Sequence, residues 1–442
     1  MRLFIALALA ALPLFGQNTD IEALAGLQFN FSNPGARSLG MGGAFIARAD
    51  DATAAEANPA GLTILRRPEV AIDIRDVSVT QTVEVGGTWP WIATMDFPAR
   101  DLDLSFASVV IPLGDFAVAG SYSRRLDFEN EIDLIGRYGT PAYHVGPQGL
   151  VPGDECNVAA GCRAYQIYPF STFVDIELES WSLTGAWKRG ALSIGLGIRY
   201  SDFAEETRVR RIDLDREGQP EFLIEQVHGS SIYGSDHDND LTFVTGMKWD
   251  FSEAWSFGAV YKDGASFPAP VFAGLTAEGE RGLHRMGSPR FHVPDIAGAG
   301  ASFRPVPLLT LSADLVWVEY SNLTDGFLSV IEFESLDKVE SIEGYGVEDG
   351  IETHLGAEYF LPFQIPLALR AGWWRDPAHE IAFRGPVRSK HDAAAAILFP
   401  GGDDEDHFAV GFGLSWPQFQ VDVAFDRSEG YSVGSLSMVV RR

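Results

Sequence analysis

Three aspartates at alternate positions, Asp236, Asp238 and Asp240, are spaced like the first ligands of a calcium-binding loop. In such a loop, carboxylates at the first, third and fifth positions bind the ion. The loop also needs a glycine at its sixth position and a glutamate at its twelfth, where this sequence has Leu241 and Met247. The pattern therefore favours a solvated acidic surface at the mouth of a loop, and we predict no metal site.

The two cysteines of the chain, Cys156 and Cys162, lie in one Gly- and Pro-rich segment. An exported protein folds in an oxidising compartment, where two such cysteines form a disulfide by default. Closing so short a loop stabilises it by about 2 kcal/mol in the chain-entropy model. A metal site would need further cysteine or histidine ligands nearby, and none has suitable spacing. We therefore predict a Cys156–Cys162 disulfide.

Motifs of enzyme chemistry are absent from the sequence. It contains no Gly-x-Ser-x-Gly turn, no His-Glu-x-x-His pair and no phosphate-binding loop. Gly298-x-Gly300 lacks the third glycine of a dinucleotide site, and the nine histidines are scattered. The formal charge of −28 argues against nucleic acid as a partner. We predict a protein that is not an enzyme and has no cofactor.

The first sixteen residues have the features of an export signal. Met1-Arg2 gives a short basic start, and an apolar run follows from Leu3 to Phe15. This run is too short to span a bilayer, and cleavage is expected after Gly16. No later segment has eighteen consecutive apolar residues, so the sequence predicts no membrane-spanning helix. We assign residues 1–16 to a signal peptide.

From residue 68 onward, apolar residues alternate with small or polar ones. In one segment Leu311 and Leu315 share a face, whereas Thr310 and Ser312 share the opposite face. A period of two is typical of strands with two different faces. Fourteen such segments lie near 68–80, 101–112, 115–127, 173–188, 191–203, 237–250, 254–264, 295–304, 307–321, 350–361, 365–375, 406–416, 418–427 and 431–441.

The connections between these segments alternate between short and long. Tight turns such as Leu113-Gly114-Asp115 alternate with long stretches, and only the last connection, 427–430, breaks the rule. The long stretches lie at about 81–100, 128–172, 204–236, 265–294, 322–349 and 376–405. Outer-membrane barrels combine an even strand number with this alternation of turns and loops. A soluble β-sandwich or lipocalin-like protein also has alternating strands, but rarely needs fourteen of them with long loops on one side.

The predicted fold class is therefore all-β: an antiparallel transmembrane β-barrel of about 14 strands over residues 67–442. Only helices and closed barrels satisfy every backbone polar group within lipid. The apolar faces of the strands would meet lipid, and the small or polar faces would line the lumen.

Residues 17–66 do not alternate and are rich in turn-forming residues. Three motifs lie here: Gly40-Met41-Gly42-Gly43-Ala44, Asp50-Asp51-Ala52 and Asn58-Pro59-Ala60-Gly61. With the surrounding residues 33–62, they resemble the N-terminal hatch of the FadL/TodX family of outer-membrane transporters of hydrophobic compounds. Weaker pieces that match the family, such as Leu369-Arg370-Ala371-Gly372, occur along the strands.

The resemblance implies a fourteen-strand barrel whose lumen is plugged by the N-terminal hatch. It also implies passive uptake of long-chain fatty acids or hydrocarbons, which bind in an apolar lumen and leave sideways into the membrane. The hatch and gating residues would be those of the first and third motifs: Gly40, Met41, Gly42, Gly43, Asn58, Pro59, Ala60 and Gly61. The side chain of Asn58 would tie the hatch to the inner wall, where Pro59 fixes the turn.

Ligand-binding residues are expected on two elements. Val316 and Val318 lie on an inward face, and Val271, Phe272 and Leu275 form an apolar group in a long loop. The expected partners are a hydrophobic small molecule and the lipid and lipopolysaccharide of the outer membrane of a Gram-negative-type cell. A second hypothesis stays open: PorV, a barrel that resembles the same family, holds exported protein partners in secretion, and large acidic loops would serve that role as well.

Overall fold

The computed structural model describes residues 32–442 except 89–90, 134–142, 147–148, 153–162, 165–169, 212–221, 224–225, 228–229, 269–270, 276–283, 288–289, 324–343, 381 and 388–400. The predicted signal peptide (1–16) and the predicted Cys156–Cys162 disulfide lie outside these residues. No helix among the described residues is long and apolar enough to cross a membrane.

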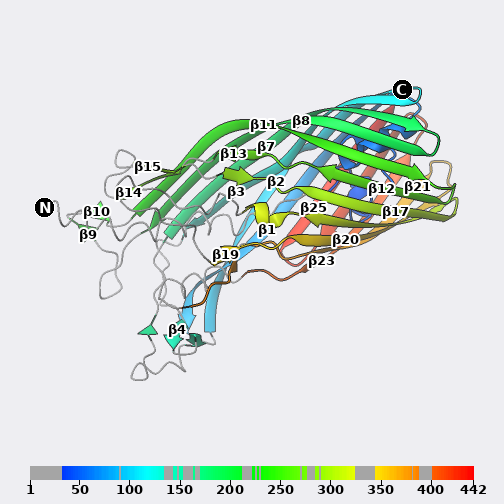
Figure 1. Ribbon diagram of the computed structural model, residues 1–442. Helices are drawn as coiled ribbons and strands as arrows, with labels where there is room; N and C mark the ends of the chain where they lie inside the picture. The colour runs from blue at the N-terminus through cyan, green and yellow to red at the C-terminus, as the bar shows by residue number, and fades with distance from the viewer. Residues whose placement is uncertain are drawn as a thin grey trace.

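Fourteen antiparallel strands close into a barrel (Figure 1). Each strand pairs with its neighbours in the chain, β11 pairs with β12, and β25 pairs back to β1, so the ring has no free edge. The strands are β1 (Glu69–Thr88), β2 (Trp91–Leu113), β3 (Phe116–Asp133), β7 (Phe170–Arg189), β8 (Leu192–Arg211), β11 (Ser230–Asp250), β12 (Trp255–Lys262), β17 (Ile296–Val306), β18 (Leu309–Val318), β20 (Gly350–Leu361), β21 (Leu367–Asp376), β23 (Glu405–Ser415), β24 (Phe419–Arg427) and β25 (Tyr431–Arg441). All fourteen predicted segments are confirmed as strands.

The two faces of the wall differ as the alternation predicted. On β8, Leu196 and Ile198 are exposed on the outside, whereas Ser193 and Arg199 are buried inside. On β18, Leu311 and Leu315 point outward, and Thr310 is buried. An apolar outer band around a polar lining is the arrangement of a barrel that spans lipid.

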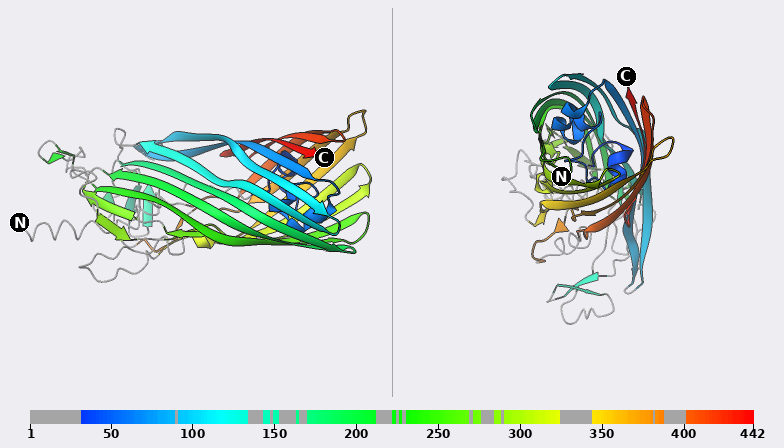
Figure 2. Two further views of the ribbon diagram at one scale, coloured as in Figure 1. Left: turned by 90° about the horizontal axis from the view of Figure 1, so that it is seen from above. Right: turned by 90° about the vertical axis from the view of Figure 1, so that its right-hand side faces the viewer.

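The barrel is taller on one side than on the other. Strands β1, β2, β3, β7, β8 and β11 have 18 to 23 residues, whereas the remaining eight have 8 to 12. About 9–11 residues suffice to span a membrane, so the first six strands extend beyond it. The tall side is seen from above in the left view of Figure 2.

Two loop predictions were wrong for this reason. The expected long loop at 81–100 is mostly strand, because β1 runs to Thr88 and β2 begins at Trp91. Asp236, Asp238 and Asp240 do not lie at the mouth of a loop but within β11, paired with β8. The extended backbone of a paired strand cannot curl around an ion as a calcium loop does. The tight turns, in contrast, lie where expected, and Gly114 and Gly190 adopt the positive φ of such turns.

Shorter strands lie within the long connections, at the end of the barrel that these connections occupy. They are β4 (Tyr143–Gly146), β5 (Gly149–Pro152), β6 (Arg163–Ala164), β9 (Phe222–Leu223), β10 (Gln226–Val227), β13 (Ser266–Pro268), β14 (Val271–Leu275), β15 (His284–Gly287), β16 (Arg290–His292), β19 (Tyr345–Gly346) and β22 (Ala382–Phe383), with the 3-10 helix η5 (Tyr320–Leu323). Among them, β14 extends the barrel sheet by pairing with the top of β11.

Residues 32–65, the plug segment, lie inside the barrel near the end with the tight turns (Figure 2, right). The segment contains α3 (Ala36–Gly40), α4 (Ala54–Ala57) and η1 (Pro59–Ile64). Helix α3 packs on β21, β23, β24 and β25, while η1 packs on β2, β3, β7, β8 and β11. The segment therefore crosses the lumen from wall to wall.

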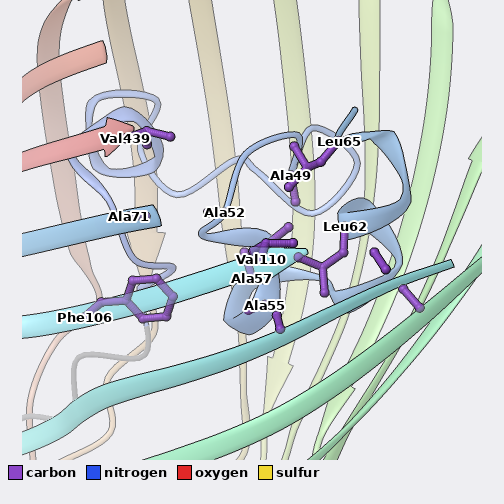
Figure 3. Close-up of a cluster of buried hydrophobic side chains, with 14 of the residues drawn as sticks. Ala49, Ala52, Ala55, Ala57, Leu62, Leu65, Ala71, Phe106, Val110 and Val439 are labelled. Carbon is purple, nitrogen blue, oxygen red and sulfur yellow. The ribbon is translucent and has the colours of Figure 1, made fainter. Parts of the chain in front are cut away.

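A cluster of small apolar side chains joins the plug segment to β1 and β2 (Figure 3). Ala52, Ala55 and Leu62 of the segment belong to the same cluster as Phe106 and Val110 of β2. Alanine side chains let the helices approach the wall closely, which suits dense packing in a narrow lumen.

Candidate functional site

The Gly40–Gly43 motif is pressed against the wall. Gly42 and Gly43 have φ of 60° and 78°, which favours glycine. A Cβ at Gly42 would lie 2.8 Å from the backbone nitrogen of Trp373, and one at Gly43 would lie 2.8 Å from Nδ1 of His354. Glycine is needed on the wall as well, because a Cβ at Gly372 would overlap the backbone of the motif. Side chains at these positions would thus push the plug off the wall.

A buried ion network fixes α3 to the wall beside this motif. Arg37 donates from Nε and Nη2 to the two carboxylate oxygens of Glu358 on β20, both at 2.9 Å. Arg370 on β21 donates to the same carboxylate at 2.8 Å and to Asp422 on β24 at 2.7 Å. Arg37 also donates to Asp50 of the plug at 2.6 Å. The network therefore links the plug segment to three wall strands.

The charges of this network balance within the lumen. Burial opposes ionisation of Asp50, yet Arg37 and Arg48 together hold the pKa of its carboxyl below the ordinary value. Nη1 of Arg48 lies 2.7 Å from Asp50. Buried ions are tolerated when they are paired in this way.

A second ion cluster lies on the opposite side of the plug segment. Glu56 of α4 accepts hydrogen bonds from Arg199 on β8 at 2.8 and 2.9 Å, and Nζ of Lys262 on β12 lies 3.5 Å away. Burial opposes ionisation of Glu56, but Arg199, Lys262 and Arg125 lower the pKa of its carboxyl to about 2. Three cations therefore surround one carboxylate.

The Asn58-Pro59-Ala60-Gly61 turn contacts the wall at β8 and β11. The side-chain amide of Asn58 donates to the carbonyl of Ile46 at 2.9 Å and to the carbonyl of Met247 on β11 at 3.1 Å. Its Oδ1 accepts the Ala60 N–H at 3.2 Å and so caps η1. The structure thus contains the tie between Asn58 and the inner wall that the sequence predicted.

The barrel wall has glycines where this turn contacts it, so no wall side chain lies between the turn and the wall backbone. A Cβ at Gly246 would overlap the Asn58 side chain, and one at Gly195 would lie 2.5 Å from the backbone of Pro59. A groove of about 690 Å³ lies on the outer, lipid-facing side of the same strands, lined by side chains such as Phe116, Trp187 and Leu196. Only backbone therefore separates the plug turn from an apolar groove on the membrane side.

Further toward the long-loop end, the lumen becomes apolar. Inward side chains of β3, β7 and β8 meet the β13–β16 pair, which reaches in from the connection between β12 and β17. The ring of Phe203 on β8 stacks on Phe267 at 4.7 Å and on Phe291 at 5.0 Å between centroids. The cluster comprises Leu126, Phe128, Val174, Ile176, Leu178, Phe203, Ala265, Phe267, Phe291 and Val293.

A small polar cavity lies between this apolar cluster and the plug segment. It has a volume of about 40 Å³ and is lined by Ser32, Pro34, Glu56, Arg75, Ser105, Ser123, Arg124, Arg125 and Lys262. Four of these side chains are cations and one is an anion. Arg125 directly precedes Leu126 of the apolar cluster, so the cationic and apolar regions are contiguous along β3. A charged head attached to an apolar tail would match this arrangement.

The predicted ligand residues lie elsewhere. Val316 packs against Ile46, Val244 and Val260, which join the plug segment to the wall, and Val318 is fully buried on the inward face of β18. Val271, Phe272 and Leu275 form β14 at the tall edge of the barrel, and their side chains lie outside the described residues. None of the five belongs to the apolar cluster around Phe203 among the residues that the structure describes.

One group of carboxylates comes close enough for a metal within the described ranges. Oxygens of Asp101, Asp103 and Asp127 lie within 4.8 Å of one another. The guanidinium of Arg124 contacts Asp103 and lies 2.6 Å from Asp127. The guanidinium of Arg124 already occupies the position that a metal ion would take, so the group is an ion-pair cluster.

Sequence reasoning missed the cationic cavity and the apolar cluster. Inward apolar residues such as Val174, Ile176 and Leu178 alternate with acids on β7, and this signal was present in the sequence. The pairing of Glu56 with Arg199 and Lys262 carried no such signal, because the three residues are far apart in the chain.

Comparison with known proteins supports the fold. No protein-family model matches the sequence, and no curated protein matches it either. Among solved structures, a FadL homologue of Pseudomonas aeruginosa matches with a TM-score of 0.64 at 14% identity, over 94% of this chain and 99% of its own. The toluene transporter TbuX of Ralstonia pickettii matches with 0.56 at 12%, over 93% and 99%. The monoaromatic hydrocarbon channel CymD matches with 0.54 at 14%, over 94% and 99%.

The chain has the fold of these channels. The matches span nearly the whole length of both partners, so the barrel is not an isolated piece of likeness. They confirm, at the level of the fold, the resemblance that the N-terminal motifs predicted.

Proposed function

We propose that this protein is an outer-membrane channel of the FadL/TodX type for passive uptake of hydrophobic small molecules. The observation that carries the proposal is the apolar cluster around Phe203, which lies inside the barrel on the long-loop side of the plug segment. Burying apolar surface in such a lumen stabilises a bound molecule by about 25 cal/mol per Å². The apolar outer wall and the shared fold favour a site in the outer membrane of a Gram-negative-type cell.

The cationic cavity favours a substrate with a carboxylate head, as in a long-chain fatty acid. Lys262, Arg125 and Arg199 are three cations acting on the single carboxylate of Glu56, and Lys262 and Arg125 line the cavity beside it. A carboxylate in the cavity would balance the excess. The tail would then lie in the apolar region, where it would replace the rings of Phe267 and Phe291 against Phe203.

The exit that we propose lies at the Asn58-Pro59 turn. Release of the Asn58 amide from Met247 would free the inner face of β11 opposite Gly246. The apolar groove on the far side of this wall would receive the molecule into the lipid. Sideways release would avoid passing a greasy molecule through water.

Binding of palmitate and of its methyl ester to the purified barrel tests the proposal. We expect both to bind, and the acid to bind at least tenfold more tightly because only the acid has a charge for Lys262. Lys262→Gln should remove most of this preference and leave the ester unaffected. Arg100→Gln, which removes an exposed cation that pairs with Asp76, is the matched control and should change neither.

Two outcomes would overturn parts of the proposal. Equal binding of acid and ester by the unmodified protein would contradict the carboxylate site while leaving a hydrocarbon channel. Binding of neither, together with capture of a specific exported protein, would instead support the PorV-like role in secretion.

A further inference from the structure

Charge is distributed unequally between the two ends of the barrel. The chain as a whole has 33 basic and 61 acidic residues. The end with the tight turns comprises residues 65–69, 113–116, 187–192, 248–255, 304–309, 361–367, 415–419 and 440–442. It carries eight basic side chains against the four acidic ones Glu69, Asp115, Asp250 and Glu253. This end, the short-turn rim, is therefore a basic surface on an acidic protein.

The basic residues gather most closely where the barrel closes. The backbone N–H of Arg442 donates to the carbonyl of Pro68 at 3.0 Å, which brings Arg442 beside Arg66 and Arg67. All three side chains are exposed. They form no ion pair within the described part of the chain. We name Arg66, Arg67 and Arg442 the seam arginines.

Glu69, the acidic side chain closest to Arg66 and Arg67 in the sequence, is already paired. Glu69 is buried, and its Oε1 accepts a hydrogen bond from Nε of Arg441 at 2.9 Å. Gln420 accepts a second bond from Arg441 at 3.2 Å. The seam arginines therefore present an excess of positive charge to the outside.

An aliphatic stripe begins directly at this cluster on the outer face. The register of β1 and β25 places Val70 beside Val440, Ile72 beside Met438 and Ile74 beside Leu436. All six side chains are between 37% and 50% exposed on the outside of the barrel. The stripe runs from the seam arginines toward the middle of the wall.

Aromatic side chains mark the level of the membrane surface at the same end. Trp416 and Phe419 stack at 4.4 Å at the turn next to the seam, and Trp255 stacks on Phe303 at 4.3 Å farther around the rim. Such rings sit at the head-group level of a bilayer. The seam arginines therefore lie at the height of lipid phosphates, with hydrocarbon beside the stripe.

We propose that the β25–β1 seam binds one anionic glycerophospholipid of the inner leaflet. Its phosphate and anionic head group contact the seam arginines, whose planar forks match phosphate oxygens. One acyl chain lies along the aliphatic stripe. The inference rests on the membrane placement in the proposed function and adds a structural lipid at the point where the barrel closes.

Native mass spectrometry of the full-length protein tests this site. The protein in detergent is mixed with equal amounts of phosphatidylglycerol and phosphatidylcholine. We expect about one phosphatidylglycerol to remain per chain, and Arg66→Gln/Arg67→Gln/Arg442→Gln to reduce its retention at least fivefold. The control Arg100→Gln/Arg208→Gln/Arg384→Gln removes three exposed cations from other parts of the barrel, and it should retain the lipid.

Equal retention of the two lipids, or equal loss in the control variant, would overturn the proposal, as would retention of lipid A in place of phosphatidylglycerol. Heat-modified mobility in gels reports whether the triple variant folds, and Arg442→Gln alone serves if it does not. Palmitate binding is measured on the same samples. If the unmodified protein binds palmitate but retains no phosphatidylglycerol, only the seam site is refuted. If it retains phosphatidylglycerol but does not bind palmitate, only the transport proposal is refuted.

Discussion

Replacing Glu358 by glutamine would remove the negative charge that joins Arg37 of the plug segment to Arg370 of the wall. Glu358 is fully buried and accepts three hydrogen bonds from these arginines, at 2.8 to 2.9 Å. Glutamine has nearly the same shape but turns one acceptor oxygen into a donor. The change therefore leaves two arginines facing an amide.

The size of the effect follows from the partners that remain. Removing one member of a buried ion pair typically costs about 3–5 kcal/mol. Asp50 still pairs with Arg37, and Asp422 still pairs with Arg370, so we expect a cost at the lower end of this range. A loss of about 3 kcal/mol raises the population of released plug by about 100-fold, since about 1.4 kcal/mol corresponds to a factor of ten.

Swelling of proteoliposomes in a small sugar measures this release. We expect Glu358→Gln to let the sugar permeate far faster than the unmodified barrel does. Glu348→Gln is the matched control, because its partner Arg384 and Glu348 itself are both exposed and such pairs contribute little. A folded Glu358→Gln barrel that stays as tight as the unmodified one would refute the role of the ion network.

Four further predictions concern other contacts of the lumen. Gly42→Ala should loosen the plug and raise its cleavage by protease, because the added Cβ meets Trp373 at positive φ, whereas Gly114→Ala in an open turn should not. Because the pKa of Glu56 is lowered to about 2, from 4.5, its anchoring is fully present above pH 4.5 and is lost as pH falls toward 2, so protease protection should persist at pH 5 and disappear near pH 2. Asn58→Ala should change uptake of palmitate without loss of membrane insertion, and unchanged uptake would count against gating. Phe203→Ala should weaken palmitate binding about tenfold in a titration if the ring lines the tail site, since truncating a buried aromatic contact commonly costs more than 1 kcal/mol.

Much of the fold could be predicted from the sequence, because every strand of a barrel wall follows the same alternation of apolar and polar residues. Each strand must show lipid an apolar face, so Leu192 to Tyr200 and Phe408 to Leu414 reveal their inward and outward sides directly. The tight turns are equally legible, since a residue such as Gly190 must adopt positive φ.

The ends of the strands were harder to predict from the sequence. Residues 81–88 and 91–100 belong to the parts of β1 and β2 that exceed the 9–11 residues needed to cross a bilayer. Outside lipid nothing requires an apolar outer face, so the alternation that identifies a strand fades. The same reason led Asp236–Asp240 to be placed at a loop mouth. The alternation of apolar and polar residues therefore predicts a strand where one face meets lipid. It does not predict a strand where both faces meet water.

The interactions inside the lumen could be predicted only in part. The motif at Asn58-Pro59 pointed to a tie with the wall, and such a tie exists at Met247. The partners of Arg37 and Glu56 could not be read in advance, because Glu358 and Arg199 come together only when the barrel closes. Whether the Gly40–Gly43 and Asn58–Gly61 motifs gate transport stays a prediction.

Uptake of radiolabelled palmitate is the most direct test of the central claim. The chain is expressed in a Gram-negative host that lacks its own fatty-acid channel, and uptake is compared with that of cells carrying the Lys262→Gln variant. The account predicts uptake that depends on the chain and falls several-fold in the variant, with equal amounts of folded barrel in the outer membrane. Folded barrel in that membrane without any gain in palmitate uptake would contradict the assignment as a fatty-acid channel.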